Sequence, residues 1–193
     1  MTSPLEIAAV ILAVLYLLLA VKENILCWAA AFFSTLLFLF LFWDAKLYME
    51  SALQLYYLAM AIYGWRQWRG SDNSAETAAL VISRWTPAQH LRALGLIVVL
   101  TVASGYALSI LTDAQRPFVD SLTTWGGVVA TFMVAKKILE NWLYWLVIDS
   151  LSVALYLDRE LYVTAMLFVV YLVIIAFGWS AWLKTYRSST ASA

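Results

Sequence analysis

The chain has 193 residues, of which 64% are hydrophobic and 12% are charged, whereas a soluble domain carries about 25% charged residues. So large an apolar share excludes a soluble globular fold and makes the lipid bilayer the expected solvent. The twelve basic and twelve acidic residues cancel, so the overall charge gives no reason to expect nucleic acid as a partner.

Seven apolar stretches follow one another along the chain, each close to the ~20 residues that cross a hydrocarbon core. They cover residues 5–21, 25–43, 47–65, 93–111, 118–135, 142–157 and 161–183. Runs of this length without polar alternation indicate helices rather than strands. Pro4, Pro87 and Pro117 stand just before or at helix starts, where a missing N–H does no harm. Thr86 is a candidate N-cap, and the prediction is an all-α integral membrane protein with seven transmembrane helices.

Basic residues gather on one side of these spans. One side has only Lys46, Arg116 and Arg159. The other side has Lys22, Arg66, Arg69, Arg84, Arg92, Lys136, Lys137, Lys184 and Arg187. Cytoplasmic loops carry the excess of Lys and Arg, so we expect the N-terminus outside and the C-terminus in the cytoplasm. The first stretch lacks the basic residues that precede a signal-peptide core, so we expect it to be retained.

The chain also repeats itself. Glu23, Asn24 and Trp28 recur 117 residues later as Glu140, Asn141 and Trp145. At an offset of 114, Asp44 matches Asp158, Tyr57 matches Tyr171, Gly64-Trp65 matches Gly178-Trp179, and Trp68 matches Trp182. The pattern predicts a 3+1+3 parallel pseudo-repeat, with repeats at 1–69 and 118–186 and a linker loop plus inverting helix at 70–117. Transporters built in this way hold their substrate near the midplane, between the two halves.

The sixth predicted helix carries the main candidate site. Asn141, Trp145 and Asp149 are spaced by four residues, and Ser152 and Tyr156 continue the same face. Asp149 lies about halfway along its span, where a carboxylate is costly unless it is paired, solvated or engaged with a cationic ligand. A structural acid bonded to a neighbouring hydroxyl is the competing interpretation. We predict that this face lines a cavity for a small solute.

Two other helices offer polar and aromatic side chains. Thr124 and Trp125 lie in the fifth predicted helix, where close helix packing is the competing account. Gln54 and Tyr57 lie in the third, where a bridge to another helix competes with solute binding. All four are candidate substrate-binding residues.

The second predicted helix repeats part of this set in weaker form. Asn24 and Trp28 mirror Asn141 and Trp145, but Phe32 stands where Asp149 would be. The two halves therefore contribute different side chains to the predicted cavity, as an asymmetric ligand would require. The tryptophans at the predicted cytoplasmic helix ends are expected to anchor the membrane interface; they are Trp65, Trp68, Trp179 and Trp182.

The sequence carries no motif for catalysis or metal binding. Cys27 and His90 are the single cysteine and histidine, so there is neither an intrachain disulfide nor a His/Cys cluster for a metal. Phosphate-binding loops, serine-hydrolase elbows and H-E-x-x-H helices are also missing. We predict that the protein is not an enzyme and needs no cofactor.

Three runs resemble the PnuC family of bacterial vitamin transporters: Glu-Asn-Trp-Leu-Tyr-Trp-Leu-Val-Ile-Asp at 140–149, Tyr-Gly-Trp-Arg-Gln-Trp at 63–68 and Phe-Val-Asp-Ser at 118–121. The resemblance covers nearly the whole chain, and the seven-helix plan is similar to that of SWEET sugar transporters. It implies facilitated diffusion of nicotinamide riboside through the inner membrane, followed by trapping when a cytoplasmic kinase phosphorylates the solute. SWEET-like proteins commonly associate, so the resemblance is also compatible with a homo-oligomer.

The same resemblance implies a central site formed by Asn141, Trp145 and Asp149, with Gln54 and Tyr57 opposite. Aromatic faces attract a cation and a carboxylate balances its charge, so the residues favour a cationic aromatic vitamin. Nicotinamide riboside and thiamine both fit this description, and other relatives carry riboflavin. A thiamine carrier is therefore the close alternative, and a membrane scaffold or receptor that transports nothing is the distant one.

Overall fold

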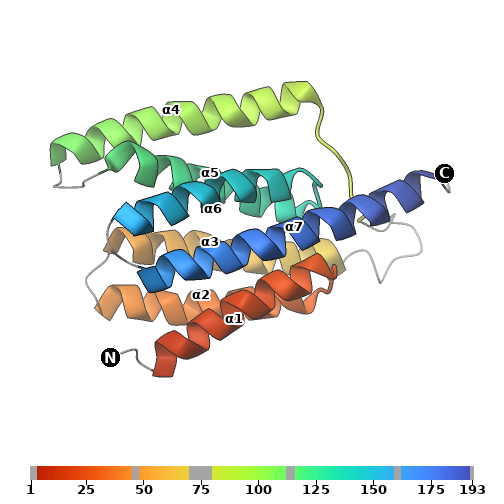
Figure 1. Cartoon of the computed structure of the whole chain (residues 1–193), viewed down its shortest axis with the longest axis horizontal. Helices are drawn as coiled ribbons and strands as arrows, with labels where there is room; N and C mark the ends of the chain where they lie inside the picture. Colours follow the sequence, from red (N-terminus) through yellow and green to blue (C-terminus); the bar gives the residue numbers. More distant parts are fainter. Residues whose placement is uncertain (1–3, 45–47, 70–79, 112–115, 159–161, 192–193) are drawn as a thin grey trace. The chain divides into compact units, whose positions relative to one another are not determined.

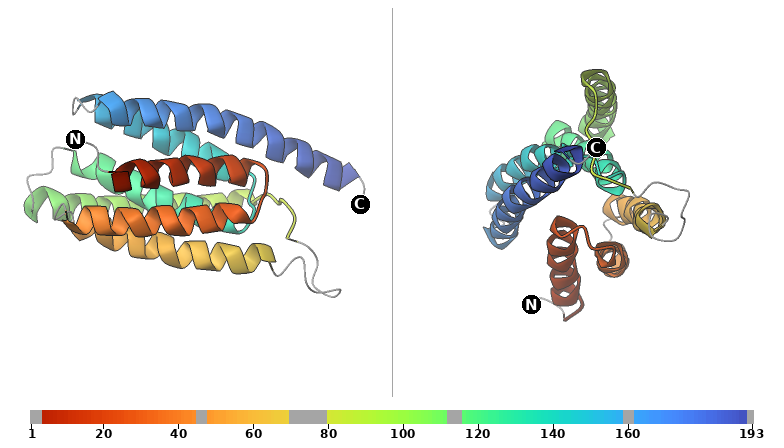
Figure 2. Two further views of the ribbon diagram at one scale, coloured as in Figure 1. Left: turned by 90° about the horizontal axis from the view of Figure 1, so that it is seen from below. Right: turned by 90° about the vertical axis from the view of Figure 1, so that its right-hand side faces the viewer.

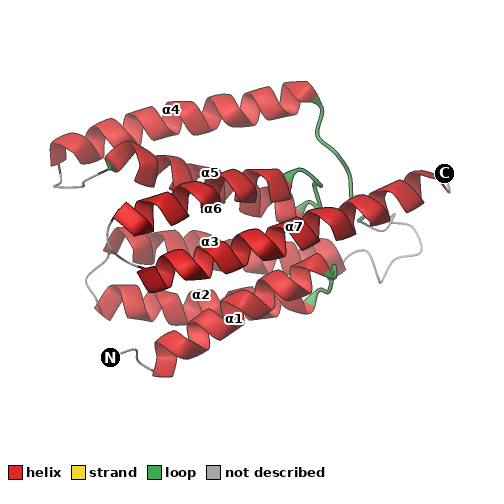
Figure 3. Ribbon diagram, in the orientation of Figure 1, coloured by secondary structure: helices red, strands yellow, loops and turns green. Residues whose placement is uncertain are grey.

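The computed structural model describes residues 4–44, 48–69, 80–111, 116–158 and 162–191. Apart from one isolated bridge between Ser83 and Ile138, the secondary structure of these residues is helical (Figure 3). In chain order the helices are α1 (Pro4–Val21), α2 (Leu26–Asp44), α3 (Tyr48–Arg69), α4 (Pro87–Leu111), α5 (Pro117–Ala135), α6 (Asn141–Asp158) and α7 (Tyr162–Ala191), as labelled in Figure 1. For the residues that the structure describes, the prediction of an all-helical protein with seven helices is confirmed.

The helix ends follow from local chemistry. α4 begins at Pro87, earlier than its apolar run, because Thr86 and Gln89 form a reciprocal cap. The Gln89 N–H donates to Thr86 Oγ1 at 3.4 Å, and the Thr86 N–H donates to Gln89 Oε1 at 2.8 Å. The predicted N-cap at Thr86 is therefore confirmed. α7 extends beyond its apolar run to Ala191.

Several of these helices can cross a bilayer. By length and composition, α1, α4, α5 and the Ala165–Ala191 part of α7 are long and apolar enough to do so. Shorter apolar runs, Leu26–Leu41 and Asn141–Leu155, lie within α2 and α6. The described residues thus have the make-up of a multi-pass membrane protein.

The chain forms two compact units. The first comprises Met1–Val81 with Ala135–Lys137, and the second comprises Ile82–Val134 with Ile138–Ala193. In the first unit α1 packs on α2 and α2 packs on α3, and Figure 2 shows these three helices running side by side. Ser34 of α2 donates a hydrogen bond to the Ala9 carbonyl of α1 at 2.8 Å. In the second unit α6 packs on α7, and contacts described below join α4 to α5 and α5 to α6.

A tryptophan seated on a glycine joins α2 to α3 in the first unit. Trp28 is 1% exposed, and a Cβ added at Gly64 would lie closer than 3.0 Å to its indole. Trp28 also meets Trp68 edge to face, with ring centroids 5.6 Å apart and planes at 89°. Because only glycine leaves room for the indole, α2 and α3 approach closely at this point.

The second unit repeats this arrangement between α6 and α7. Trp142 is 1% exposed and covers Gly178, and it meets Trp182 edge to face at 5.5 Å and 89°. Trp28 therefore corresponds to Trp142, 114 residues on, and its predicted pairing with Trp145 is wrong. Trp68 and Trp182 are 5% and 0% exposed, so the expectation that they anchor the membrane interface is also wrong.

The turns that end α1 and α5 match at the same offset of 114. Glu23 and Lys137 both adopt the left-handed region, with φ of 53° and 51°. In each turn an N–H reaches back five residues: Asn24 to the Leu19 carbonyl at 3.0 Å, and Ile138 to the Met133 carbonyl at 2.9 Å. This is the Schellman way of closing a helix. Glu23 thus corresponds to Lys137, and the predicted correspondence of Glu23 with Glu140 is wrong.

Candidate solute-binding site

The centre of α6 carries a buried carboxylate. Asp149 is 4% exposed, and no basic side chain in the described part of the chain forms an ion pair with it. Tyr171 of α7 lies near this carboxylate. An acid buried in a membrane helix without a cationic partner is costly, so this position favours a ligand that brings positive charge.

Trp145 lies one turn before Asp149 on the same face of α6 and is partly exposed. Its indole is therefore accessible, unlike that of Trp142 one turn earlier. Ser152 differs from Trp145, because it is buried and its hydroxyl proton is already donated to the Ile148 carbonyl at 2.9 Å. Trp145 and Asp149 form the part of the predicted stripe that is best suited to an aromatic cation.

Asn141 has a different setting. It is fully buried at the first residue of α6, and its Nδ2 donates to the Ile138 carbonyl at 2.7 Å. Its Oδ1 has no hydrogen-bond partner among the described residues. The rise of a helix places Asn141 about 12 Å along the axis from Asp149. Asn141 therefore shapes the turn before α6 and lies two turns away from the carboxylate.

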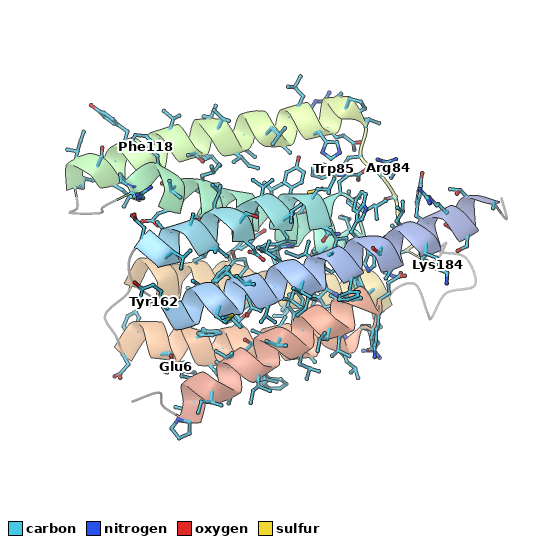
Figure 4. The ribbon with its side chains drawn as sticks, in the orientation of Figure 1. Glu6, Arg84, Trp85, Phe118, Tyr162 and Lys184 are labelled. Carbon is cyan, nitrogen blue, oxygen red and sulfur yellow. The ribbon has the colours of Figure 1, made fainter. Side chains whose placement is uncertain are left out.

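The α5 candidates lie near α4. The Trp125 indole N–H donates to the Ser104 hydroxyl of α4 at 3.1 Å, so its polar edge is used within the second unit. Thr124 beside it is partly exposed. Gly105 of α4 lies against Phe118 at the start of α5, which Figure 4 labels, and a Cβ on that glycine would meet the phenyl ring. Trp125 thus acts in helix packing.

α5 also approaches α6 closely. A Cβ added at Gly126 would lie 3.0 Å from the Ile148 side chain. Ile148 directly precedes Asp149, so the small residue on α5 fixes the distance from that helix to the centre of the candidate site. Small residues at helix interfaces commonly serve this purpose in membranes.

Gln54 and Tyr57 lie one turn apart on α3, in the first unit, and both are half-buried. The Tyr57 ring contacts that of Tyr56, with centroids 5.5 Å apart. At the offset of 114, Tyr57 corresponds to Tyr171, the tyrosine near Asp149. Tyr171 is a candidate that the sequence reasoning missed, although the Tyr57 match could have revealed it.

The remaining two candidates have structural roles. Trp28 is enclosed by Gly64, Trp68 and Tyr16, which leaves little of its faces for a ligand. Asn24 Oδ1 accepts the Leu26 N–H at 2.9 Å in an exposed turn, so it caps the start of α2.

A polar cluster ties the segment before α4 to the start of α6. Glu140 is 6% exposed and pairs with Arg84 Nε at 2.6 Å, and its other oxygen accepts the Trp85 N–H at 3.3 Å. Figure 4 labels Arg84 and Trp85 in this segment. The hydrogen bond and charge of Glu140 raise the pKa of Arg84 above its ordinary value. The Leu139 N–H also donates to the Ser83 carbonyl at 2.9 Å. Glu140 therefore has a structural role, because it helps to hold the segment before α4 against the start of α6.

Comparisons with known proteins agree with this architecture. A family model described as "Nicotinamide mononucleotide transporter" matches residues 3–184. The chain belongs to this transporter family. That membership confirms the resemblance to PnuC and the prediction that the protein is a transporter and not an enzyme.

Relatives of the family match most of the chain. The nicotinamide riboside transporter PnuC of Escherichia coli (strain K12) is 25% identical over 210 residues, covering 96% of this chain and 87% of its own length. The riboflavin/roseoflavin transporter RibM of Streptomyces davaonensis is 27% identical over 185 residues, covering 93% and 84%. A crystal structure of the vitamin B3 transporter PnuC aligns with a TM-score of 0.74 at 23% identity, over 94% of this chain and 81% of the other. This last match establishes the fold.

Proposed function

We propose that the chain carries nicotinamide riboside across the bacterial inner membrane by facilitated diffusion, and that a cytoplasmic kinase traps the solute by phosphorylation. The observation that carries this proposal is the buried Asp149, with the accessible Trp145 beside it and Tyr171 nearby. A pyridinium ring offers the flat cation that such a set attracts. The PnuC relative of 25% identity supports the same solute.

The family description names the mononucleotide, but the site favours the riboside. A phosphate group would call for Arg or Lys at the site. No basic side chain of the described residues pairs with Asp149, and a second negative charge nearby would add repulsion. An unphosphorylated cation is therefore the better match.

The proposed roles differ between residues. Trp145 stacks on the ring and Asp149 balances its charge, while Thr124 provides a polar contact to the ribose or the carboxamide. Gln54 and Tyr57 of the first unit stay candidates from the sequence alone. Asn141 positions the start of α6 instead of touching the solute. Asn24, Trp28 and Trp125 contribute through capping and packing.

The proposed architecture is seven transmembrane helices in a 3+1+3 parallel repeat, with repeats at 1–69 and 118–186 and the linker at 70–117. The two Schellman turns and the two Trp-on-Gly contacts, each pair 114 residues apart, support it. The excess of basic residues on one side supports an outside N-terminus and a cytoplasmic C-terminus. We also propose that copies of the chain associate as a homo-oligomer.

Two alternative substrates, thiamine and riboflavin, are compatible with the same transport mechanism. Thiamine is also an aromatic cation, so Asp149 and Trp145 suit it equally. Riboflavin is favoured by a separate observation, the 27% identity to the riboflavin/roseoflavin transporter RibM. Riboflavin is uncharged, however, and would leave Asp149 without compensation.

Thermal unfolding of the purified chain in detergent, with each vitamin in parallel, tests the proposal. A ligand at 100 times its Kd stabilises the folded state by about 2.7 kcal/mol. Stabilisation by nicotinamide riboside alone is the expected result. Stabilisation by thiamine or riboflavin alone would reassign the substrate, and no stabilisation by any of the three would contradict the proposed site.

A further inference from the structure

An apolar groove runs between α2 and α3 in the first unit. It encloses about 270 Å³ and is lined by Ala29, Phe32, Phe33, Ala61, Ile62 and Arg66, together with Trp28 and Trp65. Phe33 and Ile62 on its rim are 56% and 46% exposed. The groove therefore opens on the outer surface of this helix pair, where a membrane protein meets lipid tails.

The groove does not suit the transported vitamin. Small-molecule sites combine apolar walls with a few convergent polar groups, and their volumes are usually about 300–1,000 Å³. Here the walls are aliphatic, phenyl and indole groups, and the charged group is a single guanidinium at one end. A hydrocarbon chain fills such a groove without leaving hydroxyl or amide groups unpaired.

The guanidinium defines the polar end of the site. Arg66 lies in the last turn of α3 and is exposed, and no acidic side chain in the described ranges forms an ion pair with it. Trp65 beside it also lines the groove, and Trp is enriched at the depth of lipid headgroups. The helix dipole accounts for a cation at a helix C-terminus, but it does not account for the apolar groove that ends there.

The second unit provides an internal comparison. At the offset of 114, Leu143 stands for Ala29, Ile175 for Ala61 and Ser180 for Arg66. The small groove-forming residues and the cation are thus replaced together in the second unit. This joint replacement links the groove to the guanidinium.

We propose that the groove binds an anionic phospholipid, with one acyl chain between α2 and α3 and the headgroup phosphate on Arg66. Under the proposed orientation, this lipid belongs to the cytoplasmic leaflet, whose anionic lipids attract basic residues near the membrane surface. Arg66 forms charge-assisted hydrogen bonds to the phosphate oxygens. The inference does not depend on which solute the protein transports.

Native mass spectrometry of the full chain, titrated with phosphatidylglycerol or phosphatidylcholine of the same acyl chains, tests this site. We expect phosphatidylglycerol to bind about fivefold more tightly, which is the effect of one basic residue at an anionic surface. Arg66→Ser should abolish that preference. Ala29→Leu, which installs the residue of the second unit, should weaken both lipids. The matched control is Arg187→Ser on α7, which should leave the preference intact.

Three results would overturn the proposal. The first is equal binding of the two lipids by the wild-type chain, and the second is an unchanged preference in Arg66→Ser. The third is a change of oligomeric state in lipid-free detergent on Ala29→Leu, because it would identify a second copy of the chain as the occupant. Arg66 is exposed, so its substitution is not expected to compromise folding.

Discussion

Glu23 and Lys137 occupy the same position in two helix-ending turns, 114 residues apart, and their side chains form an ion pair with 2.9 Å between Oε2 and Nζ. The side chains are only 23% and 14% exposed. Lys137 Nζ also lies 4.8 Å from the centroid of the Trp68 ring. The two left-handed residues therefore fix the turn at residues 135–137 within the first unit.

Loss of this pair should lower stability. Lys137→Met would leave the Glu23 carboxylate largely buried without its partner, at a cost of about 1–3 kcal/mol. Thermal unfolding in detergent measures the loss. Glu23→Gln combined with Lys137→Met should recover much of it, because the uncompensated charge is then removed.

The Arg116–Asp158 pair provides the control for burial. Its atoms are 2.7 Å apart, but its side chains are 52% and 44% exposed. Solvent screening reduces the value of such a pair to below about 1 kcal/mol, so Arg116→Gln should have a small effect. A loss from Arg116→Gln as large as that from Lys137→Met would contradict the role given to burial.

Alanine at the two tryptophan-covered glycines should destabilise the protein. A Cβ at Gly64 or Gly178 would lie closer than 3.0 Å to a buried indole. The overpacking costs about 1–3 kcal/mol, which exceeds the roughly 1 kcal/mol that alanine gains over glycine in a helix. Gly95→Ala is the control, since a Cβ there has nothing within 4 Å, and it should raise stability. Equal shifts at all three sites would show that the contacts do not matter.

Trp125 should behave as a packing residue. Trp125→Phe and Ser104→Ala each remove the hydrogen bond of 3.1 Å between the two side chains and should each cost about 1 kcal/mol. Ser104→Ala also removes the bond of 2.7 Å from the hydroxyl to the Leu100 carbonyl. The double variant should cost little more than either single one, because the bond can be lost only once. If Trp125 touched the solute, Trp125→Phe would change the Kd for nicotinamide riboside while Ser104→Ala would not.

Asp149→Asn tests the charge of the site. Loss of the carboxylate should raise the Kd for nicotinamide riboside about tenfold above the wild-type value, equivalent to roughly 1.4 kcal/mol. Ligand-dependent unfolding measures both Kd values. Asp158→Asn, at the other end of α6 from Asn141, is the control and should leave the Kd for nicotinamide riboside unchanged. A Kd for nicotinamide riboside that is unaffected by Asp149→Asn would remove the carboxylate from the binding site.

The helices could be predicted because apolar composition decides them directly. Long runs without charges require a spanning helix, and Pro87 after Thr86 marks the start of α4. The register of the repeat could not be read as easily. The shared Glu-Asn at 23–24 and 140–141 suggested an offset of 117, whereas the matching turns place Glu23 opposite Lys137. Left-handed positions are hard to see when neither residue is glycine or asparagine.

The site was only partly predictable. Asp149 stands out because an acid inside an apolar span is unusual. The roles of Trp28, Trp125 and Trp68 depended on partners from other helices, namely Gly64, the Ser104 hydroxyl and the Ala135 carbonyl, which accepts the Trp68 N–H at 3.3 Å. A tryptophan that stacks on a solute and one that packs on a glycine look the same in a sequence.

The Trp-on-Gly contacts bear on how a carrier of this kind could move. An indole packed directly against a glycine prevents α2 from sliding along α3, and it prevents α6 from sliding along α7. Each pair should therefore move as one rigid element during transport.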